Sequence, residues 1–360
     1  MRKNAKLNYI DSIRGIAILM VIMVHAAQPF QNLNPIIKSL SYYGQLGVQL
    51  FFIASAYTLC LSSDNRHGES SAKLKYGIRR YFRIAPLYYL AIMLYGCLTY
   101  FTHYVDFKAN YTVYNVLANV FFLHGFSPSA NNNIVPGGWS IGTEMIFYAI
   151  FPFLLRLVKL GLRRSKVYLY AFIFLGIALS QIFVYFLSSH GLEMKNNSFL
   201  YFNIIVQLPV FIVGISYFFY SEMTTKSKPV WMLFLGFSIF TIITSSLFFS
   251  DRPYLSSIYP ISAAFSFVFL MEIFKTVDKL NITFLRKIGQ ASYAMYIVHF
   301  LFAYKFFFLV FRFFPQIDNT PMFFVFFPLT VIFSFISAKI LEKIIEKPGI
   351  RLGKKSIDKL

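Results

Sequence analysis

The feature that most constrains this chain is a series of long apolar runs that recur along almost its whole length. Most of them approach the roughly 20 residues that a helix needs to cross a bilayer, and they do not alternate as barrel strands do. With 57% hydrophobic and 13% charged residues, the 360-residue chain is too apolar for a soluble domain. The sequence therefore predicts an all-α membrane protein, a polytopic bundle of about ten transmembrane helices. We expect the spans at about 12–29, 42–62, 84–103, 138–157, 167–188, 199–220, 230–249, 255–274, 290–311 and 322–343.

The distribution of positive charge predicts the orientation of the bundle. With the N-terminus inside, most of the 34 Lys and Arg residues lie at inner ends and loops, as the positive-inside rule requires of a cytoplasmic face. Ten spans then place both termini in the cytoplasm, and we expect a multi-pass protein of the cell inner (plasma) membrane. Because no basic domain or zinc-finger spacing accompanies the net charge of +20, nucleic-acid binding is not expected. The residues outside this pattern are Lys38, Lys108, Lys195, Arg252, Arg312 and Lys305.

The chain is expected to form one membrane-embedded domain over residues 1–350, followed by a short basic cytoplasmic tail at 351–360. The tail is expected to be solvated or bound to lipid headgroups. The segment 112–126 is apolar but too short to cross, so we expect it at the outer interface or re-entering the bilayer. Cys60 and Cys97 both fall inside expected spans and indicate neither a disulfide framework nor a metal site.

Two polar residues interrupt the first apolar run, RGIAILMVIMVHA at residues 14–26. Arg14 and His25 are eleven residues apart, which is close to three full helical turns, so they share one face about 16 Å apart along the axis. Ionisable groups within a span are costly and mark function more often than not. Taken singly, Arg14 is also explained as an inner-end residue that snorkels to lipid headgroups. His25 taken singly is also explained as a packing residue. Their shared face favours a lined cavity.

A second polar block, RRYFRIAPLYY, begins the third expected span. Arg80 and Arg83 are three residues apart on one face, and Pro86 is expected in the first helical turn. A positive-inside collar would explain these arginines by charge alone. An anionic cofactor such as coenzyme A would use their guanidinium groups to hold its phosphates. The residues leave both interpretations open.

The third block is PGGWSIGTEMIFYAIFP, residues 136–152. Trp139 lies at interfacial depth, and Glu144 follows inside the span with Tyr148 four residues on, on the same face. A buried carboxylate can orient a histidine ring, or it can bond structurally to a neighbouring helix. In the last block, GQASYAMYIVHF, Tyr296 and His299 share a face. His299 is interpreted either as a pocket residue or as a core histidine.

These blocks, in this order, resemble the acyltransferase-3 family of integral membrane acyltransferases. The resemblance covers most of the chain and rests on YIDSIRGIAILMVIMVH, FFIASAYTL, RRYFRIAPLYY, GGWSIGTEMIFYAIFP and SYAMYIVHF. It departs at Ala56, where the family commonly has Gly, and at Val298, where a Trp often precedes the histidine. It implies a ten-helix bundle that takes an acyl group, usually acetyl, from cytoplasmic coenzyme A. That group passes to a hydroxyl of an envelope glycan.

The resemblance also implies roles for single residues. His25 is expected as the general base, or as the carrier of an acetyl-histidine intermediate, with Glu144 orienting it. Arg14, Arg80 and Arg83 are expected to hold the phosphates of acetyl-CoA. The substrate pocket is expected to include Trp139, Ser140, Tyr148, Tyr296 and His299.

The expected partners are therefore acetyl-CoA as donor, a glycan or lipid-linked glycan as acceptor, and membrane lipid. No cofactor is expected to stay bound and no metal is implied, because no histidine and carboxylate cluster has ligand spacing. A transporter or flippase of a lipid-linked sugar is the alternative, since intramembrane charges are equally at home there. A flippase would be indifferent to the acetyl donor, which separates the two.

Overall fold

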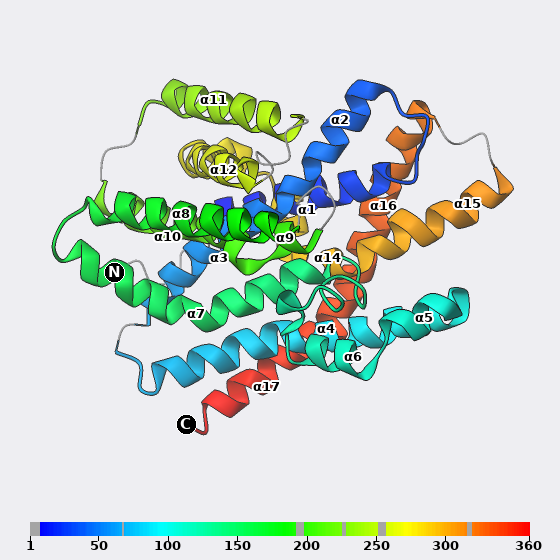
Figure 1. Ribbon diagram of the computed structural model, residues 1–360, viewed down its shortest axis with the longest axis horizontal. Helices are drawn as coiled ribbons and strands as arrows, with labels where there is room; N and C mark the ends of the chain where they lie inside the picture. Colours follow the sequence, from blue (N-terminus) through cyan, green and yellow to red (C-terminus); the bar gives the residue numbers. More distant parts are fainter. Residues whose placement is uncertain (1–7, 67, 192–197, 225–227, 251–256, 315–318) are drawn as a thin grey trace.

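The computed structural model describes the chain except residues 1–7, 67, 192–197, 225–227, 251–256 and 315–318. Every regular element in these described parts is a helix (Figure 1). Nine helical segments among them are long and apolar enough to cross a membrane. The span expected at 255–274 corresponds to a further helix of 18 residues, whose bounds are 259–276. The prediction of an all-α, polytopic membrane bundle is confirmed. Lys195 and Arg252, expected on the outer side, lie outside the described residues.

The helices of the first half of the chain are α1 (Asn8–Ala27), α2 (Pro35–Tyr43), η1 (Gly44–Leu46), α3 (Gly47–Asp64), α4 (Ala72–Thr102), α5 (Tyr104–Asn110), α6 (Val113–Val120), η2 (His124–Phe126) and α7 (Gly138–Leu162). Those of the second half are α8 (Tyr168–Ser189), α9 (Ser198–Phe202), α10 (Ile204–Met223), α11 (Val230–Phe248), α12 (Tyr259–Thr276), η4 (Asp278–Leu280), α13 (Thr283–Gln290), α14 (Ser292–Phe300), the π-helix η5 (Leu301–Phe306), α15 (Phe307–Phe313), α16 (Thr320–Leu341), the π-helix η7 (Glu342–Glu346) and α17 (Lys347–Ile357).

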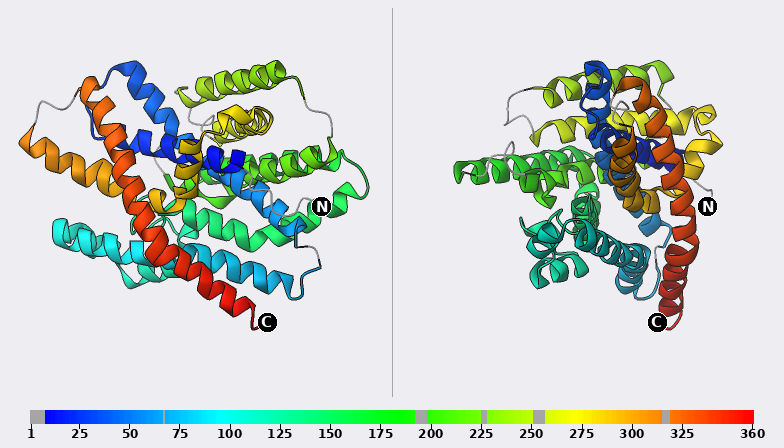
Figure 2. Two further views of the ribbon diagram at one scale, coloured as in Figure 1. Left: turned by 180° about the vertical axis from the view of Figure 1, so that it is seen from behind. Right: turned by 90° about the vertical axis from the view of Figure 1, so that its right-hand side faces the viewer.

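The ends of the helices gather on two opposite sides of the bundle. In Figure 1 the end of α3, the start of α4, the turn between α7 and α8 and the C-terminus lie on the left. The end of α1, α5 and the end of α15 lie on the right. Figure 2, left, shows the same separation from behind. This arrangement agrees with an inner side that carries the C-terminus and an outer side that carries α5.

Helix α1 lies at the centre of the bundle, where it packs against α3, α13, α14 and α16. Its approach to α13 is close enough that only glycine fits at the crossing. A Cβ on Gly289 would lie 1.7 Å from the carbonyl oxygen of Asp11, and one on Gly15 would lie 2.3 Å from that of Leu285. Small residues at helix crossings let backbones approach and gain van der Waals contact, which drives association inside a bilayer. The position of α1, and so of Arg14 and His25, is therefore fixed by backbone contact.

Helix α4 corrects one expectation. It begins at Ala72, so Pro86 lies in the helix interior and not in its first turn. The apolar run marks only the part of the helix in hydrocarbon, whereas the helix continues through charged residues on the inner side. Arg80 and Arg83 consequently lie in the third and fourth turns of α4, on a rigid helical segment.

The C-terminal segment also differs from the expected tail, which was to be solvated or bound to lipid headgroups. Residues 320–357 form one long rod, seen in orange to red in Figure 2, left. Its last part, α17, packs on α4 through two glycines: a Cβ on Gly349 would lie 2.7 Å from the ring of Pro86, and one on Gly353 would lie 2.7 Å from Cβ of Phe82. Most of the expected tail at 351–360 is therefore a docked helix.

The segment 112–126 does not cross, as expected. It forms the eight-residue helix α6 and the short η2. Val113, Tyr114 and Leu117 of α6 are exposed, whereas His124 is fully buried and its Nε2 lies 3.0 Å from the carbonyl oxygen of Gly138. This segment therefore anchors the start of α7 from the outer side.

Candidate active site

A cavity of about 70 Å³ lies between α1, α3, α4, α7 and α14. It has room for a few water molecules, at roughly 10–15 Å³ each. Six of the ten residues expected at the site lie on its wall, which brings together four separate sequence blocks. The lining side chains are Arg14, Val48, Phe51, Phe52, Ser55, Arg83, Ile84, Ser140, Ile141, Glu144, Tyr148, Ser292, Tyr293 and Tyr296.

Two guanidinium groups, those of Arg14 and Arg83, contribute positive charge to the cavity wall. Arg14 donates from Nη2 to Oγ1 of Thr58 at 3.4 Å. Glu346 of η7 interacts electrostatically with Arg83. Arg14 belongs to α1 and Arg83 to α4, so two helices each place a positive charge at the same small cavity.

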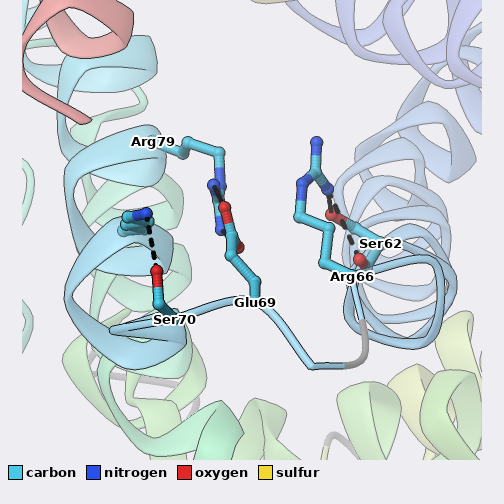
Figure 3. A network of polar contacts seen from close by, with 6 residues as sticks. Ser62, Arg66, Glu69, Ser70 and Arg79 are labelled. Carbon is cyan, nitrogen blue, oxygen red and sulfur yellow. Dashed lines mark hydrogen bonds and ion pairs between the residues drawn. The ribbon is translucent and has the colours of Figure 1, made fainter. Parts of the chain in front are cut away.

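A neighbouring arginine is neutralised outside the cavity. Arg79 donates to both carboxylate oxygens of Glu69, at 2.9 and 2.8 Å (Figure 3). These hydrogen bonds from Arg79 lower the pKa of Glu69 below its usual value. Within the described residues neither Arg80 nor Arg83 forms such an ion pair. In this part of the chain Arg80 and Arg83 therefore have no carboxylate in direct contact, although Glu346 interacts electrostatically with Arg83.

Arg80 lies behind the cavity wall. Its guanidinium is 5.8 Å from the ring centre of Tyr76 and 5.6 Å from that of Tyr148, distances at which a cation is attracted to a ring face. Its Nε is buried and has no hydrogen-bond partner among the described residues. Arg80 thus contacts the cavity through Tyr148, whereas Arg83 lies on the cavity wall itself.

Glu144 is bonded within the cavity wall. Its Oε1 accepts from the hydroxyl of Ser55 at 2.6 Å and from that of Tyr148. The predicted shared face of Glu144 and Tyr148 is borne out by this bond. Among the described residues the expected contact between Glu144 and His25 is not formed, because the carboxylate is bonded to these two hydroxyls instead. Ser55 was not foreseen, although it stands in the FFIASAYTL block.

The opposite end of the cavity is closed by a small hydrogen-bonded cluster. Ser140 donates to the phenol oxygen of Tyr296 at 2.7 Å, and Tyr296 donates to the carbonyl oxygen of Gly137 at 3.1 Å. Gly137 has a φ of +72°, a left-handed conformation that glycine adopts without cost. This conformation starts α7 and brings its backbone against α14. Ser140 and Tyr296 are therefore wall residues, as expected.

His25 lies beyond this cluster, outside the cavity wall. Its ring centre is 4.5 Å from that of Phe300 and 5.3 Å from that of His299. Its Nδ1 lies 2.9 Å from Oε1 of Gln28 and 3.0 Å from the hydroxyl of Tyr304. Tyr296 lines the cavity and Phe300 contacts His25, and these residues are one turn apart on α14. One helical turn thus separates the cavity from the imidazole.

Two further expected pocket residues belong to the packing around the site. Trp139 is not on the cavity wall; it stacks on Phe202 at 4.3 Å and meets Phe52 edge-on at 6.2 Å. His299 is fully buried, with Nδ1 2.8 Å from the carbonyl oxygen of Tyr296. Both expectations of a pocket-lining role are corrected, because large aromatic neighbours cover these rings.

The fold and the site now permit comparison with known proteins. The chain belongs to the acyltransferase-3 family: the model of that family's acyltransferase domain (Acyl_transf_3) matches residues 7–339. The exopolysaccharide production protein ExoZ of Rhizobium meliloti is 34% identical over a region covering 30% of this chain and 33% of that protein. Putative O-acetyltransferases of Staphylococcus aureus strains COL and MSSA476 are 25% identical over 97% of this chain and 59% of theirs. The match thus covers under two thirds of these relatives. No solved structure gives a significant match.

Proposed function

We propose that this chain is a membrane-bound O-acetyltransferase that moves an acetyl group from cytoplasmic acetyl-CoA to a hydroxyl of a bacterial surface glycan, such as O-antigen, capsule or exopolysaccharide. One observation carries the proposal. A single cavity has the guanidinium groups of Arg14 and Arg83 on its wall and reaches Tyr296, one helical turn from the residues that contact His25. The arginines proposed to bind the anion and the histidine proposed to accept the proton thereby follow one another along α1.

The donor phosphates are proposed to bind Arg14 and Arg83 on the cavity wall, with Arg80 adding positive charge from behind Tyr148. Guanidinium groups match phosphate oxygens in geometry and keep their charge when buried. The pairing of Arg79 with Glu69 supports this choice, because Arg79 is held by a carboxylate outside the cavity whereas Arg80 and Arg83 have none in direct contact within the described residues. The phosphates would enter from the inner side, which the positive-inside rule makes cytoplasmic.

Glu144 is proposed to bind the donor's arm, in place of the orienting role expected from the sequence. Its carboxylate lies on the cavity wall between the arginines and Tyr296. The pantetheine arm carries amide N–H groups, and a carboxylate is a good acceptor of the hydrogen bonds that these groups donate. Glu144, Ser55 and Tyr148 thus offer a polar wall along the route of the arm, and the thioester would reach the Tyr296 end.

His25 is proposed as the general base. A neutral ring nitrogen takes the proton of the acceptor hydroxyl as its oxygen attacks the thioester carbonyl, and the C–S bond breaks. The coenzyme A thiolate then receives that proton from the imidazolium. Because the cavity of about 70 Å³ ends before His25, the side chains of Tyr296 and Phe300 would have to turn aside for the thioester to reach the imidazole.

The relatives support the acceptor class. One is named for exopolysaccharide production and others for O-acetyl transfer, and both names fit a sugar hydroxyl as acceptor. The remaining parts of the proposal are a single membrane domain over 1–350 and a location in the plasma membrane with both termini in the cytoplasm. The long basic rod at 320–357 would end on the cytoplasmic side.

The test is transfer of labelled acetyl from acetyl-CoA to surface glycan in membranes that contain the wild-type chain, His25→Ala or His190→Ala at matched amounts. His190 is a matched control, because it is exposed at the end of α8 and bonds locally to the carbonyl oxygen of Phe186. Loss of a general base costs about 10²- to 10⁴-fold.

We expect label with the wild type and His190→Ala, and loss of at least about 100-fold with His25→Ala. Label that survives His25→Ala would keep the transferase and remove His25 as the base. No label with any of the three, across O-antigen, capsule and exopolysaccharide acceptors, would reject the proposal in favour of a carrier of lipid-linked sugar.

A further inference from the structure

The hydrogen bonds of His25 come from two residues that no sequence block singled out. Gln28 follows the end of α1, and its backbone N–H still bonds the carbonyl oxygen of Val24 at 3.1 Å. This helical continuation turns the Gln28 side chain back over His25, three residues earlier. Tyr304 comes from the other side, on η5, and its hydroxyl donates to Oε1 of Gln28. His25, Gln28 and Tyr304 form a closed triangle of hydrogen bonds.

The triangle decides which nitrogen of His25 carries the proton. Oε1 of Gln28 is a carbonyl oxygen and can only accept. It receives the Tyr304 hydroxyl, and it lies 2.9 Å from Nδ1 of His25. With the Gln28 amide in this orientation, Nδ1 is the protonated nitrogen, and Nε2 carries the lone pair in the neutral ring. In hydrolytic triads a carboxylate or amide fixes the tautomer of the base in the same manner.

The π-helical turn explains how Tyr304 reaches this position. In a π-helix each backbone hydrogen bond spans five residues rather than four, and such turns are frequent at functional sites. Tyr304 stands five residues after His299 and its ring is stacked on Phe300, 5.8 Å away. The phenol is thereby directed at α1. If this turn were a regular α-helix, the side chain of Tyr304 would point in a different direction.

Among the described residues, few groups that can titrate face His25. They are His299 from α14, with ring centres 5.3 Å apart, and Tyr304 from η5. His299 holds its own proton on Nδ1, because its Nδ1 faces the carbonyl oxygens of Met295 and Tyr296. Within the described residues, no carboxylate bonds to His25.

We infer that Gln28 and Tyr304 are the positioning residues of the proposed base: they hold His25 with Nδ1 protonated and Nε2 free. The inference rests on the proposed function. In the transfer step Nε2 takes the hydroxyl proton, the new C–O bond forms, the thioester C–S bond breaks, and the thiolate receives the proton from Nε2. Nδ1–H stays bonded to Gln28 throughout, and the positive charge of the imidazolium is stabilised by that oxygen.

The experiment measures kcat, KM for acetyl-CoA and the pH profile of acetyl transfer for Gln28→Met, Gln28→Glu and Tyr304→Phe. Methionine keeps the shape of glutamine and removes the acceptor, whereas glutamate keeps an acceptor and adds charge. Two controls lose a comparable hydrogen bond elsewhere. Gln290→Met loses the bond from Gln290 to Asp11 on α1, and Tyr95→Phe loses the bond to the carbonyl oxygen of Ile297.

We expect Gln28→Met to lower kcat about 10- to 100-fold, the usual loss when the partner that orients a functional histidine is removed. Its KM should change less than about twofold, because the donor site is untouched. Gln28→Glu should keep kcat within a few-fold at alkaline pH and lose activity at higher pH than the wild type. The reason is that a carboxylate on Nδ1–H stabilises the protonated ring. Tyr304→Phe should lose less than Gln28→Met.

Each other result overturns the inference. Wild-type kcat and pH profile in Gln28→Met would show that Gln28 does not position His25. A Gln28→Glu enzyme as inactive as Gln28→Met, with an unmoved profile, would show that Nδ1 is not the donor. Equal losses in the Gln290→Met and Tyr95→Phe controls would indicate a general structural effect. An inactive wild type would instead overturn the proposed function, and this inference with it.

Discussion

Replacement of Gly137 by alanine tests how the start of α7 supports the site. Gly137 has φ +72°, and a Cβ there would lie 2.8 Å from the ring of Phe300 and 3.0 Å from the hydroxyl of Tyr296. Both neighbours matter, because Phe300 lies against His25 and Tyr296 closes the cavity. The substitution therefore strains the backbone and displaces two site residues at once.

The size of the effect follows from these two contributions. A left-handed conformation costs an alanine about 1–2 kcal/mol. Forcing a methyl group into a packed interior costs about 1–3 kcal/mol more, and Phe300 has little freedom, since only 5% of its surface is exposed. We expect a total destabilisation of about 2–5 kcal/mol.

Gly77→Ala is the matched control. Gly77 lies in the helical part of α4, and nothing lies within 4 Å of the position that a Cβ would take there, so alanine should favour the helix by up to about 1 kcal/mol. The two glycine-to-alanine changes thus have opposite expected signs. The assay is thermal unfolding in detergent, followed by the fluorescence of the two tryptophans, Trp139 and Trp231, together with acetyl transfer.

Gly137→Ala should melt roughly 4–10 °C below the wild type, at about 2 °C per kcal/mol, and lose transfer activity. Gly77→Ala should melt at or slightly above the wild-type temperature with activity retained. Equal melting temperatures for the two variants would refute the strain argument. A Gly137→Ala protein that melts low but transfers normally would refute the link between Gly137 and the site.

Four further predictions concern charge and orientation. Arg83→Ala should raise KM for acetyl-CoA about 10- to 100-fold, since a charge-assisted hydrogen bond contributes about 1.5–3 kcal/mol; an unchanged KM would remove Arg83 from the donor site. Glu144→Gln should leave the acid limb of the pH profile unmoved, because Glu144 bonds Ser55 and Tyr148 and not His25; a moved limb would restore the orienting role. Cysteine at Lys38 should react with an impermeant maleimide on intact cells and cysteine at Lys355 should not, with the reverse pattern contradicting the orientation. Glu69→Gln should lower the free energy of unfolding at pH 7 by less than about 1 kcal/mol, seen as a slightly lower melting temperature. This difference between the variant and the wild type should vanish in acid. The lowered pKa of Glu69 makes its stabilisation present above the usual carboxyl range and lost as pH falls through the folded-state value; a difference that persists after Glu69 is protonated would show a cause other than this ion pair.

The helices and their order could be predicted from the sequence because hydrocarbon leaves few alternatives. An apolar run of about 20 residues must be helical to satisfy its backbone, and α7 begins at Gly138 as its Gly-Gly break indicates. The start of α4 at Ala72 was not predicted, since Lys73, Lys75 and Arg79 are polar yet good helix formers. Hydropathy marks the membrane, whereas helices extend beyond it.

Only those contacts of the site that join residues of the same helix could be predicted from the sequence. The shared face of Glu144 and Tyr148 follows from their spacing, and the hydrogen bond confirms it. The partners of His25 could not be found in this manner. Gln28 lies at the polar end of a span, where any residue is tolerated. Tyr304 follows a π-helical turn, where the 3.6-residue period that places side chains no longer holds.

The distance between Glu144 and His25 has a chemical consequence. A carboxylate against the imidazole would favour its protonated form, which cannot accept the proton of a hydroxyl. The neutral amide of Gln28 fixes the same tautomer without that charge, because its oxygen accepts from Nδ1–H. The carboxylate lies instead on the cavity wall with Arg14 and Arg83, where it offsets positive charge that would otherwise be confined in a small space. Along α1, charge is thus gathered at the proposed donor site, and a neutral network surrounds the imidazole that is proposed to exchange a proton.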